Sequence, residues 1–366
     1  MRIKKGTVNS CYCFDVGGEI DVGTAASLFG GEAEKALLIC KRLLPRHIQY
    51  RVPPLFVREG AVEMSIGGSV RFVTVDAKIY DYGAVTVRMG FPFAGSLEEL
   101  AGLSAQLVEN AELRACAVSR LKGIVERMRP HIRNPREDFE GEWEDYYVYL
   151  IEETEEPEEM EMLVARHGAA VARVLRSEKS LSASEIEDAL KYRLSYYGND
   201  LTLIDWNSTF IFDPEKSYDV QDVIEFAVIQ LLELRLYDAM LDGVIERAHD
   251  ELASSRERRF NLFPFFATLE RLLRIKLDVS DIIDRVENSL KLIGDLYLAK
   301  VYRTASARFY LDTWKSAVRE KLNVLESLYS TSWDRAQTRR MIVAEIAIIL
   351  LFVIDIVLIL LELLKP

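Results

Sequence analysis

The sequence predicts an α+β fold in three consecutive parts: a ferredoxin-like α/β sandwich domain over residues 1–156, an all-helical domain over residues 157–340, and a single transmembrane helix over residues 341–364. Three observations predict these parts. Apolar runs of strand length lie mainly in the first, apolar residues at three- and four-residue spacing dominate the second, and the third is almost wholly apolar. At roughly one domain per 150 residues, a chain of 366 residues suffices for two or three units.

The first part combines four expected strands with two expected helices. Apolar and β-branched runs predict the strands over 11–16, 70–75, 84–89 and 146–151. Apolar spacing predicts a helix over 24–44, and a second helix over 96–129 begins at the capping box Ser96-x-x-Glu99. The order of strand, helix, two or more strands, helix and strand is that of a split β-α-β domain of ferredoxin-like type.

The second part is predicted to be helical with one interruption. The expected helices cover 158–177, 183–197, 219–255, 264–276, 279–308 and 311–330 or further. The stretch 201–212 could be a short hairpin or a buried loop, with Asp205-Trp206-Asn207 as its turn. The apolar stripes of the long helices favour an intramolecular bundle, and a coiled-coil stalk that joins subunits is the alternative.

The third part predicts a membrane tail anchor. Of the 23 residues from 342 to 364, eighteen are Ile, Leu, Val or Phe. At about −0.3 to −0.6 kcal/mol each they contribute roughly −5 to −11 kcal/mol to insertion, whereas Asp355 near the centre costs about +3 kcal/mol. Arg335, Arg339 and Arg340 precede the segment, so the chain is expected in the lipid bilayer of the cytoplasmic membrane as a single-pass protein with its N-terminal domains in the cytoplasm. The alternative is a buried helix in a soluble oligomer.

Three acidic residues within the anchor are the candidate site residues: Glu345, Asp355 and Glu362. A carboxylate in lipid needs a protein or water-filled surrounding, because lipid offers no hydrogen-bond partner. Asp355 and Glu362 are seven residues apart and lie on nearly the same side of a helix. They are expected to line the interface of a homo-oligomer, and a relay of protons or cations is the alternative.

The charge of the chain is concentrated in one segment. The net charge is −12, from 46 Lys and Arg against 58 Asp and Glu. Residues 137–161 hold thirteen carboxylates and no Lys or Arg, so the remainder is near neutral. The segment is expected to be a solvated face or hinge, with a site for a divalent cation or a basic partner as the alternative. Nucleic acid is not an expected partner.

No motif predicts a catalytic, cofactor or metal site. The sequence contains no P-loop, no His-Glu-x-x-His and no Gly-x-Ser-x-Gly. Cys11 and Cys13 share one face of a strand, but no second pair of ligands follows at usable spacing, so both are expected in the core. Four cysteines give little material for disulfides, which favours a reducing compartment, and no cleaved targeting segment is visible.

Several short motifs resemble the Required for Meiotic nuclear Division family, whose shared region is a domain of unknown function. These motifs are Cys13-Phe14-Asp15-Val16, Glu19-Ile20-Asp21-Val22, the run from Tyr80 to Val87, and Leu325-Glu326-Ser327-Leu328-Tyr329. The resemblance implies a membrane-tethered, self-associating protein without an established catalytic activity. Mitochondrial members of that family are linked to translation at the inner membrane, which would be the location of a eukaryotic member.

Three classes of function follow from the sequence. The first is a non-enzymatic, self-associating scaffold that binds itself and an unknown protein partner at a membrane. The second is an oligomer that relays protons or cations through its acidic anchor residues. The third is an enzyme with an unrecognised cleft in the α/β domain.

Overall fold

The computed structural model describes residues 1–35, 53–108, 110–139, 143–155, 160–215, 218–254, 277 and 296–363. The chain forms two compact units. The first contains Met1–Leu236 and Asp281–Lys315, and the second contains Tyr237–Ser280 and Ser316–Pro366. The expected helix over 264–276 lies outside the described residues, as does most of the expected helix over 24–44.

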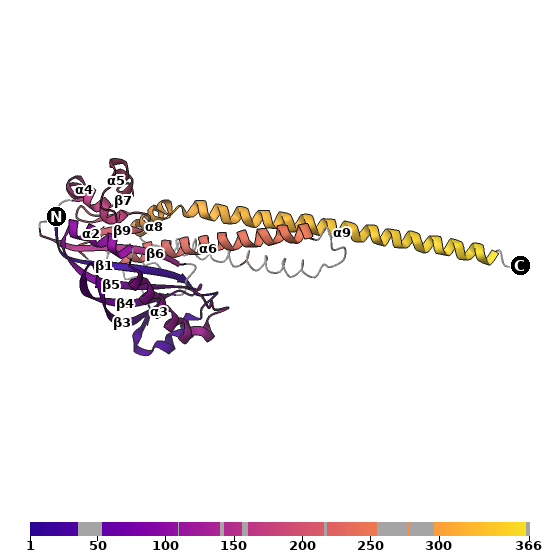
Figure 1. Ribbon diagram of the computed structural model, residues 1–366, viewed down its shortest axis with the longest axis horizontal. Helices are drawn as coiled ribbons and strands as arrows, with labels where there is room; N and C mark the ends of the chain where they lie inside the picture. Colours follow the sequence, from indigo (N-terminus) through magenta and orange to yellow (C-terminus); the bar gives the residue numbers. More distant parts are fainter. Residues whose placement is uncertain are drawn as a thin grey trace. The chain divides into compact units, whose positions relative to one another are not determined.

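A nine-stranded sheet forms the centre of the first unit, in the order β2-β3-β4-β5-β1-β6-β9-β8-β7. Its strands are β1 (Arg2–Asp15), β2 (Ala33–Lys35), β3 (Leu55–Ile66), β4 (Ser69–Ile79), β5 (Ala84–Ser96), β6 (Trp143–Thr154), β7 (Arg193–Leu194), β8 (Leu201–Ile204) and β9 (Ser208–Phe212). Figure 1 shows β1, β5, β4 and β3 side by side. All described pairings are antiparallel except β6 with β9, so the sheet is mixed.

One face of this sheet is apolar and packs against three helices: α2 (Leu97–Val108), α3 (Ala111–Met128) and α4 (Met160–Arg176). The expected capping box opens α2, since the Ser96 hydroxyl accepts from the Glu99 amide while Glu99 accepts from the Ser96 amide. Asn110 caps α3, which divides the single helix expected over 96–129 into two. Four short helical elements are also present: α1 (Val22–Ala25), η1 (Ala26–Glu32), η2 (Arg129–His131) and α5 (Ala183–Ala189).

The opposite face of the sheet lies beneath helix α8 (Leu296–Arg308) and the part of helix α6 (Asp219–Ser254) that belongs to the first unit. Arg235 of α6 pairs with Glu144 of β6 at 2.5 Å. The ring of Phe309, directly after α8, meets the ring of Tyr146 of β6 edge to face at 5.6 Å. Both faces of the central strands are therefore buried, which is why β1 is buried almost without interruption from Val8 to Asp15.

The ferredoxin-like architecture expected for residues 1–156 is wrong, although the fold is α+β. The four expected strands are present, but β3 was not expected, and the hairpin β8–β9 joins the same sheet by pairing with β6. Between β1 and β2 the structure has only the short α1 and η1 instead of the beginning of a long helix. The strand β3 was not predicted because charged residues at its solvent-facing positions, such as Arg58 and Glu63, obscure the apolar alternation by which a strand is recognised.

The acidic segment 137–161 is not one solvated face. Its middle forms β6, the strand that lies between β1 and β9. Tyr146 to Ile151 are buried there, and Glu152 is buried with them. The apolar run within the segment makes it a buried strand despite the neighbouring charges. The sheet supplies partners for several of the carboxylates, as Lys5 does for Glu152 at 2.9 Å.

The prediction of a transmembrane tail anchor is not supported. The last helix, α9 (Leu311–Leu363), is continuous, and within the described part of the chain no helix has both the length and the apolarity to cross a membrane. The expected location as a single-pass protein of the cytoplasmic membrane is corrected accordingly.

Candidate functional site

The sheet face beneath α6 is lined by polar and charged side chains. Residues paired directly across neighbouring strands point to the same face, and the register pairs Arg88 with Cys11 and with Asp76. We call this surface the polar sheet face; its members are Asn9, Cys11, Cys13, Lys78, Tyr80, Thr86 and Arg88. Residues one position along each strand, such as Tyr12 and Val87, belong to the apolar face.

Two carboxylates of α6 meet the cations of the polar sheet face. Asp222 and Glu225 are three residues apart and therefore lie on one side of the helix. The Lys78 ammonium pairs with Asp222 and lies 3.5 Å from Glu225. The Arg88 guanidinium lies 3.8 Å from Asp222 and 3.6 Å from Glu225, and the Tyr80 hydroxyl donates to Glu225 at 2.8 Å. Two cations and two carboxylates thus balance within one buried cluster.

The charges in this cluster stabilise one another despite their burial. Burial alone would raise the pKa of Glu225, but Lys78 and Arg88 hold that pKa below its ordinary value. For Arg88, burial acts to lower the pKa, and Glu225 together with Asp222 raises it. Removing one member would leave a buried charge without its partner, which costs about 3 to 5 kcal/mol in folded proteins.

Amide and thiol groups complete the polar layer. The Asn9 side-chain amide donates to the Gln221 carbonyl of α6 at 3.2 Å, whereas the Gln221 nitrogen has no hydrogen-bond partner among the described residues. The Cys13 sulfur lies 3.5 Å from the Thr86 hydroxyl. Burial raises the pKa of the Cys11 thiol to about 12 and raises that of Cys13 well above its ordinary value, so both thiols are protonated near neutral pH.

The contacts of this cluster are ion pairs and a hydrogen bond between the sheet and α6 of the same chain. A lysine, an arginine and a tyrosine hydroxyl converge on two carboxylates, which is an arrangement that binds acidic side chains. The thiols are protonated and are not activated as nucleophiles. Within the residues that the structure describes, no group of three or more His, Cys, Asp or Glu side chains could hold a metal ion.

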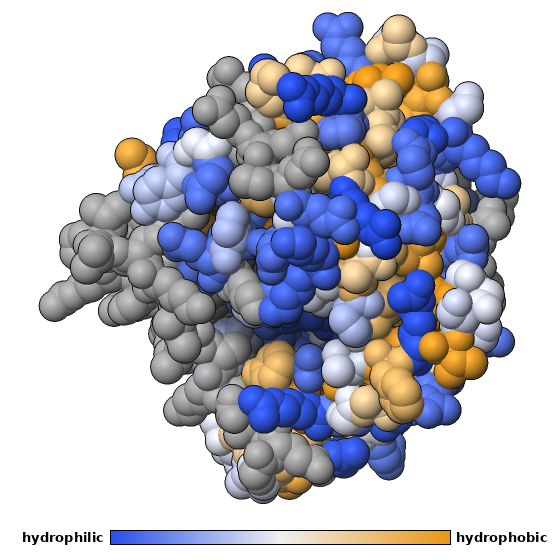
Figure 2. All heavy atoms as spheres, turned by 90° about the vertical axis from the view of Figure 1, so that its left-hand side faces the viewer, coloured by the Kyte–Doolittle hydropathy of each residue, from blue (hydrophilic) through white to orange (hydrophobic). Residues whose placement is uncertain are grey.

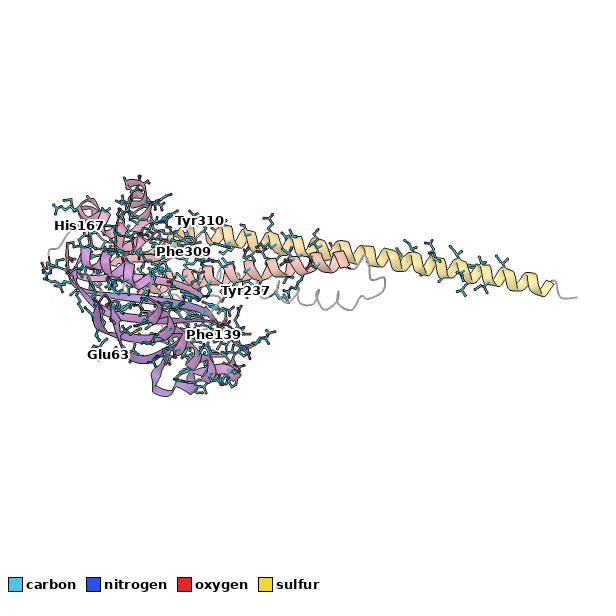
Figure 3. All side chains as sticks on the ribbon, viewed as in Figure 1. Glu63, Phe139, His167, Tyr237, Phe309 and Tyr310 are labelled. Atoms are coloured by element: carbon cyan, nitrogen blue, oxygen red, sulfur yellow. The ribbon has the colours of Figure 1, made fainter. Side chains whose placement is uncertain are left out.

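A second buried charge cluster joins α8 to the tip of the β8–β9 hairpin. Asp205, which is 1% exposed, lies 2.9 Å from the Arg308 Nε and 2.7 Å from the Arg176 Nε. Arg308 also donates to Asp188 of α5 at 2.9 Å, and this hydrogen bond lowers the pKa of Asp188. Phe309 and Tyr310 follow at the start of α9, where Figure 3 labels them, and both rings lie near Trp206.

The acidic residues predicted from the sequence lie in the last third of α9. Glu345 is exposed, whereas the side chains of Asp355 and Glu362 lie outside the described residues, as do those of Arg335, Arg339 and Arg340. Around Glu345 the described side chains are mostly large and apolar, and Figure 3 shows sticks projecting from more than one side of this segment. Among the described residues, no ion pair of the Glu345 side chain is present.

The polar sheet face was not predicted, because in the sequence its charged residues look like ordinary solvent-facing positions of a strand. One signal could have found it. Arg88 stands in a strand, β5, whose other positions from Ala84 to Ala94 are nearly all apolar, which is typical of a strand buried on both faces. A charge in such a strand requires a partner, and Asp222 and Glu225 at helical spacing are candidates for that role.

Comparison with known proteins places most of the first unit in one family. Residues 5–219 match the family described as the N-terminal domain of the uncharacterised protein MJ0711. The chain is 24% identical over 217 residues to the uncharacterised protein MJ0711 of Methanocaldococcus jannaschii, an alignment that covers 59% of this chain and 65% of that protein, just under two thirds of its length. No solved structure matches the chain. Neither match links the chain to the Required for Meiotic nuclear Division family, so that resemblance remains a prediction.

Proposed function

Because the chain belongs to the family of the MJ0711 N-terminal domain, which takes its name from an uncharacterised protein, we propose a function from the chain's own surfaces: it is a self-associating scaffold that assembles through the end of α9. The observation that carries the proposal is the exposure of apolar side chains there. Eleven large apolar residues between Met341 and Ile356 each keep 45% to 65% of their surface exposed.

These side chains surround the helix. Successive residues of an α-helix are about 100° apart, so Ile348 and Leu350 point to nearly opposite sides. Both are more than half exposed. A surface helix of an ordinary globular protein has one apolar stripe, whereas a helix that is apolar all round is buried on all sides. The described surroundings provide no such cover, and we infer that further copies of the chain provide it.

The energy available is sufficient for association. Complete burial of a large aliphatic or aromatic side chain contributes about 1.5 to 3 kcal/mol, so covering the exposed half of eleven such side chains contributes roughly 8 to 16 kcal/mol per chain. Loss of translational and rotational freedom costs about 4 to 15 kcal/mol. The gain from hydrophobic cover is thus of the same size as the cost of association or larger.

The remaining surface favours assembly through this segment over assembly through the sheet domain. On the face that Figure 2 shows, hydrophilic side chains lie with apolar residues between them. Large exposed apolar residues occur in the first unit as short groups, such as Val70 and Phe72 of β4. Between Met341 and Ile356, by contrast, they follow one another along the helix.

A pair of charge substitutions tests the proposal on the full chain. Ile349→Glu with Phe352→Glu places two carboxylates in the apolar segment, and Val70→Glu with Phe72→Glu is the matched control because those side chains are also more than half exposed. Light scattering coupled to size exclusion, in a mild non-ionic detergent that limits non-specific aggregation, gives the particle mass. The wild type and the control should be oligomers, and the α9 variant should have the mass of one chain, 41.8 kDa. A wild-type monomer, or an α9 variant of unchanged mass, contradicts the proposal.

A further inference from the structure

The helices α6 and α9 run parallel where they lie beside each other. The Arg235 guanidinium of α6 lies over the ring of Trp314 of α9, at 5.9 Å from its centroid. Further along both helices, the Lys321 ammonium of α9 pairs with Asp238 at 2.7 Å and with Asp242 at 2.6 Å. Because these contacts advance toward the C-terminal end of each helix, the two helices have the same direction.

The apolar end of α9 extends past the described end of α6. Lys321 is level with the middle of the stretch 238–242, and α6 ends at Ser254. At an equal rise per residue in both helices, Ser254 is level with about residue 335 of α9. The segment 341–356, which we call the apolar segment, therefore begins where α6 no longer accompanies α9. This position accounts for the exposure of its side chains.

Glu345 favours an antiparallel arrangement of neighbouring copies. It is the one charged residue among the described side chains of the apolar segment, and the residues one turn before and after it are Met341, Ile342, Ile348 and Ile349. Parallel copies in register would bring their Glu345 carboxylates to one level, where like charges in an apolar contact repel each other. In an antiparallel pair centred on the segment, the two carboxylates are about 10 Å apart along the helix axis.

The sequence of α9 carries opposite charges toward the two ends of the apolar segment. Residues 334–340 contain three arginines and one aspartate, a net charge of +2, whereas residues 355–363 contain Asp355 and Glu362 without Lys or Arg, a net charge of −2. Parallel copies would place each of these stretches level with its own kind. In an antiparallel pair centred on the apolar segment, or up to about two residues further along, Glu362 of one copy is level with a position within 335–340 of the other.

We propose that the apolar segments of neighbouring copies pair antiparallel, so that the arginine-rich start of each segment is level with the acidic end of the other. This inference rests on the proposed self-association through α9 and adds the direction of the partner helix. Charges beside an apolar helix contact set the orientation of the partner, while the apolar side chains supply most of the binding energy. Each copy requires a neighbour of opposite direction, so the contact is two-fold and the particle contains an even number of chains.

Cross-linking of full-length chains in a mild non-ionic detergent measures the direction. One copy carries Ile342→Cys and a differently tagged copy carries Ile356→Cys, at positions that are about half exposed. The two positions are about 21 Å apart along one helix, which exceeds the reach of a short bismaleimide linker. The linker should join the mixed pair, identified as cross-linked peptides by mass spectrometry, and chains of either kind alone should not be joined through these positions. Parallel copies would give the reverse result.

Charge reversal tests the same direction without cross-linking. Arg339→Glu with Arg340→Glu should weaken self-association at least about tenfold, because in an antiparallel pair every reversed position faces the acidic end of the other copy. Adding Asp355→Arg and Glu362→Arg to the same chain should restore the association. In parallel copies each stretch would face its own kind before and after reversal, so the affinity would not change. Lys300→Glu with Arg303→Glu, at exposed positions of α8, alters the net charge equally and is the matched control.

Failure of this inference and failure of the proposed function give different results. A monomeric wild type contradicts self-association itself. An oligomeric wild type with an odd number of chains, cross-links between two Ile342→Cys chains, or unchanged association of the doubly reversed Arg339 and Arg340 variant overturns the antiparallel direction alone. Loss of association that the two added arginine substitutions restore, in chains that circular dichroism shows to be folded, supports it.

Discussion

At the residue scale, single backbone contacts fix the end of the sheet where β1 ends and β4 turns into β5. Gly83 has a φ of +99°, and a Cβ at this position would collide with the backbone carbonyl oxygens of Gly17 and Gly18. The Val16 amide donates to the Gly83 carbonyl at 2.8 Å in the same place. Only glycine allows this approach, because every other residue adds both the Cβ and the cost of a positive φ.

Gly83→Ala should therefore destabilise the protein by roughly 2 to 5 kcal/mol, the sum of a left-handed backbone and a forced steric overlap. Gly102→Ala is the control, because a Cβ there meets nothing within 4 Å and Gly102 lies inside α2. That change should add about 0.5 to 1 kcal/mol of helix stability. Denaturant unfolding of both variants measures the difference, and equal effects would show that the close approach does not constrain the fold.

Glu233 of α6 is a buried carboxyl whose charge state affects stability. Burial, with Asp15 as a like charge, raises its pKa well above the ordinary value, while Arg136 acts in the opposite direction. The unfolded chain ionises this group near its ordinary pKa of about 4.3. Its contribution to stability is thus complete below that pH and is lost as the pH rises through the higher pKa of the folded state.

Glu233→Gln should raise the melting temperature near neutral pH, with a gain that shrinks toward pH 4, because glutamine has no charge to bury. Glu246→Gln, at an exposed position of the same helix, should have little effect at any pH. Thermal unfolding between pH 4 and pH 8 measures both variants. A loss of stability in Glu233→Gln at neutral pH would show that the carboxyl is ionised and paired.

At the element scale, the sequence predicted the elements whose periodicity is strong. The strands over 11–16, 70–75, 84–89 and 146–151 and the helix over 219–255 are present, and the stretch 201–212, expected to be either a hairpin or a buried loop, is a hairpin with Asp205-Trp206-Asn207 as its turn. The helix expected over 183–197 ends at Ala189, and the strand β7 follows it. It missed β3, whose charged positions hide the strand period, and it did not foresee that β9 would pair in parallel with β6. Such long-range pairing depends on burial of whole faces, which local patterns do not encode.

The cluster around Asp205 connects elements that are distant in sequence, and one substitution tests how much it contributes. Asp205→Asn removes the buried carboxylate that the buried Arg308 shares with the partly buried Arg176, so it should cost about 3 to 5 kcal/mol. Asp188→Asn removes the second carboxylate of the same arginines, but its side chain is 43% exposed and the loss should stay near 1 kcal/mol. Urea unfolding of the two variants distinguishes these outcomes, and equal losses would contradict the role assigned to Asp205.

At the scale of the whole molecule, the sequence indicated that the C-terminal segment is unusually apolar, but the membrane location predicted for it is not supported. The estimate for insertion used every residue from 342 to 364, whereas the described helices contain no span of sufficient length and apolarity. The sequence could signal that a charge in a buried strand needs a partner, but local patterns could not identify that partner, because Lys78 and Asp222 are 144 residues apart in sequence. Apolar exposure along α9 now supports assembly through copies of the chain.

Self-association through the end of α9 requires that two copies of this chain be held in one particle. Co-expression of two full-length copies with different affinity tags tests it most directly, with capture through one tag and quantification of the other. Wild-type chains should retain the second copy, and chains with Ile349→Glu and Phe352→Glu should lose it while remaining folded. If a folded wild-type chain is captured without the second copy, its α9 segment is covered by nothing or by a different protein. That result would contradict self-association through α9.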